Sequence, residues 1–231
     1  MRTMQAIFVK QALDMMKNRA TLIQIVVFPL LAFALTELIA KPDATIPDGM
    51  FVTMFASIFA GMLLLMMTAG CIAEDREHKS LRFLVMAGVK PHEYLIGSSG
   101  VILLTGGVVS VVFGLLGGLS AGDFGRFWAI MMLCSAASML FGALIGLLVN
   151  NQQAAIAIAM PVAMVLGFAP MFAQFNETVH RVLGGLYTLQ MDAVLNGTTS
   201  SLGHPFMIAA ANGVVLLALF IVVYKRKGLR N

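Results

Sequence analysis

Residues 50–79 read MFVTMFASIFAGMLLLMMTAGCIAEDREHK, an apolar run that ends in a dense charged block. The run from Met50 to Ala73 is long enough to cross a membrane, because about 20 helical residues span a hydrocarbon core of ~30 Å. The charges that begin at Glu74 cannot lie in hydrocarbon, where each ion would cost about 3 kcal/mol or more. We therefore expect a membrane-spanning helix whose polar end protrudes on one side of the bilayer.

Comparable apolar runs recur along the chain, which has 231 residues, 59% of them hydrophobic and only 11% charged. The strands of a membrane barrel would instead be segments of about 10 residues with alternating polarity. We therefore predict an all-α integral membrane protein that forms a single domain over residues 1–231. Its six predicted spans are Ala20–Leu38, Met50–Ala73, Tyr94–Leu119, Phe127–Val149, Ala154–Phe172 and Pro205–Tyr224.

The basic residues indicate the topology. Twelve of the 15 lysine and arginine residues fall in the N-terminal segment, in the link after the second span or in the C-terminal tail. Cytoplasmic segments of membrane proteins carry such an excess, so we expect both termini and that link to be cytoplasmic. The net charge of +4 is then a topology signal, and we expect no nucleic-acid partner.

Two segments outside the spans have helical patterns of their own. Over residues 1–19, apolar side chains recur on one stripe from Met4 to Met16, which predicts an amphipathic helix in the membrane interface. Whether this helix also contacts a cytoplasmic partner stays open. Over residues 173–204, apolar residues recur at helical spacing from Val179 to Leu186. This pattern favours an external amphipathic or re-entrant helix over an open loop.

The link over residues 74–92 is predicted to form a short helix that Gly88 and Pro91 end. Topology alone needs only lysine and arginine, yet acidic and basic residues alternate here beside Leu81, Phe83 and Leu84. A surface of mixed charge with apolar side chains suits docking to another protein. We favour this interpretation over a simple topological anchor.

The sequence offers no pattern for catalysis, metal binding or nucleotide hydrolysis. The dipeptide Gly-Lys never occurs, so the phosphate-binding loop of nucleotide hydrolases is missing. The four histidines are isolated, which predicts no metal site. Residues 97–100, GSSG, resemble the serine motif of rhomboid proteases, but no later span carries the histidine base that such a serine needs. We expect no enzyme, no catalytic residue and no cofactor in this chain.

Residues 72–84, IAEDREHKSLRFL, resemble a motif of the ABC-2 type permeases, the membrane subunits of bacterial ABC exporters. The resemblance extends to Phe28-Pro29 in the first span, to Tyr94-Leu95-Ile96-Gly97 at the start of the third, and to the long external segment. It implies a multi-pass protein of the bacterial plasma membrane that pairs with a second permease copy or paralogue. It also implies a cytoplasmic ABC ATPase subunit as partner, and that subunit would bind ATP and magnesium.

The resemblance implies roles for particular residues. A coupling helix between spans two and three, with the N-terminal helix as a second contact, would dock on the ATPase. The docking residues would be Glu74, Asp75, Arg76, Glu77, Ser80, Leu81, Arg82, Phe83, Leu84, Asp14, Lys17 and Arg19.

The resemblance implies a cargo of the classes that the family handles, namely drugs, antimicrobial peptides, lipids or glycans. The first two spans carry almost no charge, which suggests an apolar or amphipathic cargo among these. The predicted path residues are Thr36, Glu37, Thr53, Ser57 and Thr68. The alternative is a stand-alone secondary carrier or channel-like protein that is not coupled to an ATPase.

Overall fold

The computed structural model describes residues 2–42, 46, 49–195 and 203–227. Six helices in it are long and apolar enough to cross a membrane, as the sequence predicts. They are α2 (Arg19–Leu35) with η1 (Thr36–Ala40), α3 (Met50–Ile58) with η2 (Phe59–Leu63) and α4 (Leu64–Glu77), α6 (Pro91–Leu116), α7 (Ala121–Leu148), α8 (Gln152–Phe175) and α11 (Gly203–Lys227). Within the described ranges the chain is helical and contains no β-strand.

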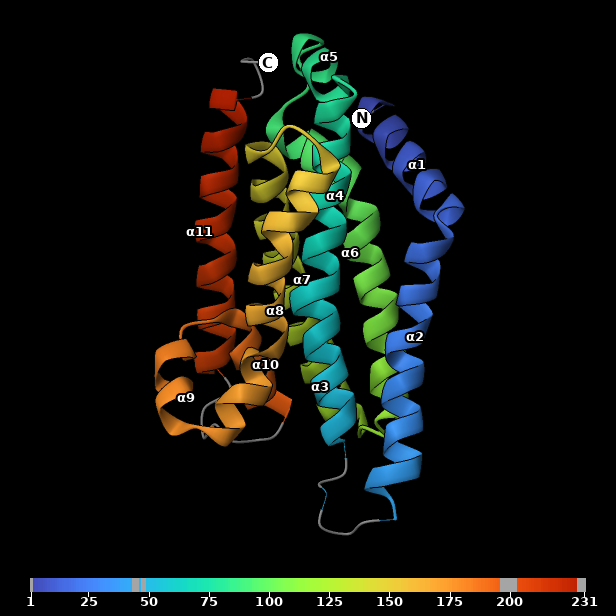
Figure 1. The fold of residues 1–231 in the computed structure, drawn as a ribbon, viewed down its shortest axis with the longest axis vertical. Coiled ribbons are helices and arrows are strands. Elements are labelled where there is room, and N and C mark those ends of the chain that lie inside the picture. Colours follow the sequence, from blue (N-terminus) through green and yellow to red (C-terminus); the bar gives the residue numbers. More distant parts are fainter. Residues whose placement is uncertain (1, 43–45, 47–48, 196–202, 228–231) are drawn as a thin grey trace.

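The six long helices run along the long axis of the molecule (Figure 1). Over the most apolar 18 residues of each span, 78% of the residues are buried in α7 and 61% in the helix from α3 to α4, but only 11% in the helix from α2 to η1 and in α11. The apolar side chains of α2 and α11 therefore face outward, where lipid or another membrane protein must cover them. The bundle is built around α4 and α7.

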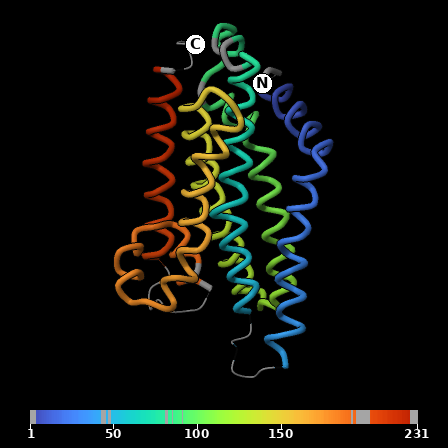
Figure 2. The backbone as a smooth tube through the Cα atoms, in the orientation of Figure 1, coloured from blue at the N-terminus to red at the C-terminus, as the bar shows by residue number. Residues whose placement is uncertain are grey.

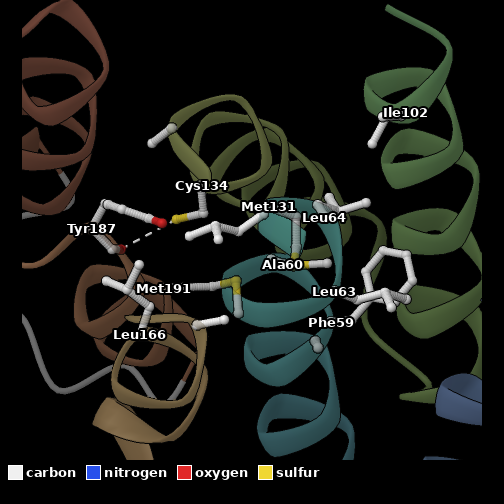
Figure 3. Close-up of a cluster of buried hydrophobic side chains, with 14 of the residues drawn as sticks. Phe59, Ala60, Leu63, Leu64, Ile102, Met131, Cys134, Leu166, Tyr187 and Met191 are labelled. Carbon is white, nitrogen blue, oxygen red and sulfur yellow. Dashed lines mark hydrogen bonds between the residues drawn. The ribbon is translucent and has the colours of Figure 1, made fainter. Parts of the chain in front are cut away.

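Glycines bring α4 and α7 into close contact. A Cβ atom at Gly142 would overlap the backbone carbonyl oxygen of Leu65, and one at Gly146 would lie 2.8 Å from the carbonyl oxygen of Ala69. Small residues let two helix backbones approach, which is a main source of helix association in lipid. Around this crossing, Phe59, Leu64 and Met131 are fully buried with side chains from α6, α8 and α10 (Figure 3).

One end of the bundle carries α1 (Arg2–Lys17), α5 (Ser80–Met86) and the last turns of α11 (Figures 1 and 2). The start of α1, the end of α11 and the link after the second span thus lie on the same side. This arrangement agrees with the distribution of basic residues, while the cytoplasmic location itself stays a prediction. Helix α1 packs along α6, where a Cβ atom at Gly97 would lie 2.8 Å from the Cβ of Ile7.

The opposite end carries α9 (Glu177–Leu183) and α10 (Tyr187–Leu195), which lie within the predicted external segment. The Tyr187 hydroxyl lies 2.7 Å from the Ser138 hydroxyl, and the Tyr187 carbonyl accepts a hydrogen bond from the Cys134 thiol at 3.2 Å. Helix α10 therefore enters the bundle beside α7. Residues 196–202 lie outside the described residues, and the depth of the segment in the membrane stays a prediction.

Except for the start at Met50, the predicted span ends differ from the helix ends by one to six residues, the most at the start of α7, which begins at Ala121 rather than at Phe127. Two of these differences have a clear physical reason. Helix α4 continues to Glu77, beyond the predicted end at Ala73, because its charged residues find partners at the end of the bundle. Helix α6 ends at Leu116 rather than at Leu119, because Gly118 adopts a left-handed backbone conformation with φ +61°.

Candidate functional site

The charged end of α4 joins several helices. Asp75 is only 7% exposed. The ammonium group of Lys10 in α1 donates a hydrogen bond to its Oδ1 atom at 3.0 Å, and the hydroxyl of Tyr94 in α6 donates to its Oδ2 atom at 3.0 Å. One carboxylate therefore ties both α1 and α6 to the end of α4.

A buried carboxylate is costly unless it is paired and hydrogen-bonded, and here both oxygen atoms have partners. Partial burial of Lys10 lowers the pKa of its amine, but the hydrogen bond and the charge of Asp75 outweigh this effect. The pKa of Lys10 is thus raised above its ordinary value of 10.5. The Lys10 amine is therefore protonated throughout the neutral pH range.

The next two residues hold the link between α7 and α8. The Arg76 guanidinium donates to the carbonyl oxygen of Leu147 and, at 3.3 Å, to the side-chain oxygen of Asn150. Glu77 accepts a hydrogen bond from the backbone N–H of Gln152 at 3.0 Å. A cation thus lies at the C-terminal end of α7 and a carboxylate at the N-terminal end of α8, the signs that each helix dipole favours.

Helix α5 follows this network directly and projects from the end of the bundle (Figure 1). Phe83 is 65% exposed and Met86 is 62% exposed. Leu84 is half-buried and packs against the cluster that contains Tyr94. Ser80 is also half-buried, and the side chains of Leu81 and Arg82 lie outside the described set. An exposed aromatic side chain on a short protruding helix is suited to fill a pocket of another protein.

A groove of about 450 Å³ opens beside α4, between α1 and α2 on one side and α8 on the other. Its volume lies within the range of small-molecule sites, about 300–1,000 Å³. The lining is polar near α5 and rich in methionine farther along α4. The lining residues include Gln11, Asp14, Asn18, Gln24, Phe28, Met62, Met66, Met67, Cys71, Glu74 and Gln152.

The predicted path residues lie elsewhere. Thr53, Ser57 and Thr68 are buried in the bundle. The hydroxyls of Ser57 and Thr68 each donate to the carbonyl four residues earlier in their own helix, at 2.9 Å. Thr36 does the same at 2.7 Å, and Glu37 pairs with Lys41 at 2.5 Å. These residues are absent from the described lining of the groove, and their role in a path stays a prediction.

The predicted docking residues fall into separate places. Asp75, Arg76 and Glu77 have the internal partners described above, whereas Asp14 and Glu74 line the groove. Lys17 and Arg19 are exposed at the junction of α1 and α2. Docking on an ATPase stays a prediction for all of these residues.

Sequence reasoning missed the residues that complete these features. Lys10 and Tyr94 could not be linked to Asp75 from spacing, because 65 and 19 residues separate them from it. Gln24 did leave a signal: it is an amide between Ile23 and Ile25 in the apolar part of the first predicted span. Polar side chains within spans usually face a cavity or the bundle interior, and Gln24 lines the groove.

Comparison with known families gives a match over nearly the whole chain. A family described as ABC-2 family transporter protein matches residues 3–222. No protein with curated annotation matches the sequence significantly.

Proposed function

Because the chain belongs to the ABC-2 family of transporter proteins, we propose that it couples to a separate ATPase as the permease of an ATP-driven exporter. The chain is a multi-pass protein of the bacterial inner membrane and an ABC transporter membrane subunit. The proposal adds the docking surface, the path of the cargo and the direction of transport.

The network around Asp75 is the observation that carries the proposal. It lies directly before α5 and joins the end of α4 to α1, to α6 and to the link between α7 and α8. A force applied to α5 by a partner would therefore reach most of the bundle through short polar contacts. Rigid-body motion of packed helices between two arrangements is a common form of switching.

The groove supports the path. It lies between helices whose outward faces are apolar, with Leu30 on α2 and Met164 on α8 among the exposed side chains. A second copy of the chain, or a paralogue, would cover these faces and close the open side of the groove. Its polar and methionine-rich walls fit an amphipathic cargo.

Co-purification with the ATPase tests the docking surface. Phe83→Asp places a charge on an exposed apolar site of α5, and Val182→Asp makes the same change on α9 at the opposite end, where Val182 is 76% exposed. We expect Phe83→Asp to lower the yield of the complex at least about 10-fold, because removal of a central aromatic contact costs about 2 kcal/mol. Val182→Asp should leave the yield unchanged.

Two outcomes would overturn the proposal. Equal loss of the ATPase from both variants would place docking elsewhere than on α5. Transport by the purified chain without ATP and without any partner would favour the stand-alone carrier.

A further inference from the structure

We propose that the groove beside α4 selects a cargo with a cationic head group and an apolar body. This inference rests on the proposed function, in which the groove forms part of the cargo path. It adds the chemical class of the cargo. The cavity and its apolar walls define the site, and the charged residues at its mouth define the sign of the ligand.

The groove has two chemically different ends. Glu74 and Met62 both line it from the helix that contains η2 and α4. These two residues are separated by about 18 Å along a helix with a rise of 1.5 Å per residue. Gln152 lines the groove near the charged end of α4, since its backbone N–H donates to Glu77, and Asp14 lines it from α1. Farther along the groove the α4 side is apolar, whereas α2 contributes the ring of Phe28 together with the polar Thr21 and Gln24. The apolar side chains of this part are Phe28, Met62, Leu63, Met66 and Met67.

The charged side chains that line the groove are both acidic. Asp14 and Glu74 both line the groove, and both are exposed. Among the described lining residues none is basic. The nearby cation of Lys10 is hydrogen-bonded to Asp75, and the guanidinium of Arg76 is directed to the α7–α8 link. A mouth with carboxylates and apolar walls attracts cations and repels anions.

The far end suits the apolar part of such a molecule. Methionine side chains are flexible and polarisable, and surfaces rich in them adapt to ligands of different shape. The ring of Phe28 can also contact a cation through its π face. A molecule with a charged amine and a bulky apolar body would therefore satisfy both ends of the groove.

Two probes of the same shape and opposite charge separate charge selection from simple hydrophobic binding. Tetraphenylphosphonium is an apolar cation, and tetraphenylborate is its anionic counterpart. Binding of each would be measured by equilibrium dialysis against the chain in lipid nanodiscs, both alone and in complex with the ATPase, with empty nanodiscs subtracted. The variant is Asp14→Asn/Glu74→Gln. Its matched control is Asp123→Asn/Glu177→Gln, which removes two exposed carboxylates at the opposite end.

We expect the complex to bind the phosphonium ion and the groove variant to bind it about 10-fold more weakly, which corresponds to ~1.4 kcal/mol. The control should bind like the original protein. The borate should bind the original protein weakly and the groove variant more tightly. If the double variant does not fold, Asp14→Asn alone gives the same comparison. For this single exposed charge we expect about a 3-fold loss of affinity for the phosphonium ion.

The outcomes for the cargo and for the proposed function can be told apart. Equal binding of both probes, no binding of either, or an unchanged affinity in the groove variant would overturn the charge selection. If the complex still forms and hydrolyses ATP in that case, the proposed function stands. If the phosphonium binds selectively but no ATPase associates with the chain, the groove inference stands and the coupling to ATP does not.

Discussion

Removal of the Tyr94 hydroxyl tests whether Asp75 holds the end of the bundle together. Tyr94→Phe deletes one oxygen atom and leaves the ring, which is fully buried and packs beside Tyr224 with ring centroids 5.7 Å apart. Hydrogen bonds to charged groups contribute about 1.5–3 kcal/mol, whereas neutral bonds between membrane helices average about 0.6 kcal/mol. Because Asp75 retains Lys10 as a partner, we expect the lower end of the charged range, about 1.5 kcal/mol.

Tyr224→Phe provides a matched control. Tyr224 is also buried in this cluster, but its hydroxyl donates only to the neutral carbonyl of Val89 at 3.5 Å. This long bond should contribute no more than the average of about 0.6 kcal/mol. The free energy of unfolding in a denaturing-detergent titration measures both effects.

Amide exchange gives a local measure of the same contact. A loss of about 1.5 kcal/mol should raise the exchange rate at the start of α6 about 12-fold. Equal effects of the two variants, or no effect of Tyr94→Phe, would refute the central role assigned to the Asp75 carboxylate.

Three further predictions concern packing, capping and pH. Gly142→Ala should destabilise the protein by about 1–3 kcal/mol in thermal unfolding, because the backbones of α4 and α7 must separate to make room for the methyl group. Gly125→Ala is the control: it has open space around it and should be neutral or stabilising by up to ~1 kcal/mol. Arg76→Met should lower the unfolding free energy by about 1–2 kcal/mol through loss of the α7 end contact, while Arg126→Met, which breaks an exposed ion pair, should change it by less than about 1 kcal/mol. The contribution of Lys10 to the free energy of unfolding should be fully present below pH 10.5 and should be lost as the pH rises through the raised pKa of its amine. Protection of α1 from amide exchange should therefore stay constant between about pH 6 and 9, after correction for intrinsic exchange rates. Faster corrected exchange of α1 within the neutral range would contradict this assignment.

The sequence predicted the helical spans well, because about 20 consecutive apolar residues have few stable arrangements other than a membrane helix. It also predicted the short helix after the second span, which α5 confirms. It was less informative for the site. The charge pattern from Glu74 to Glu77 suggested a docking surface, yet three of these four side chains have partners within the chain. A charge pattern gives the residue types but not the distant residues that approach them.

Composition and periodicity alone determined that this chain is a six-span helical membrane protein with its basic segments at one end, since lipid excludes charge and unpaired backbone groups wherever the chain crosses it. Only the tertiary structure decided that Asp75 meets Lys10 and Tyr94, and that Asp14 and Glu74 face a common groove. The physical reason is that these contacts depend on the packing of α1, α4, α6 and α8. That packing is set by close approaches of small residues such as Gly97 and Gly142, which leave no long-range signal in the order of the residues.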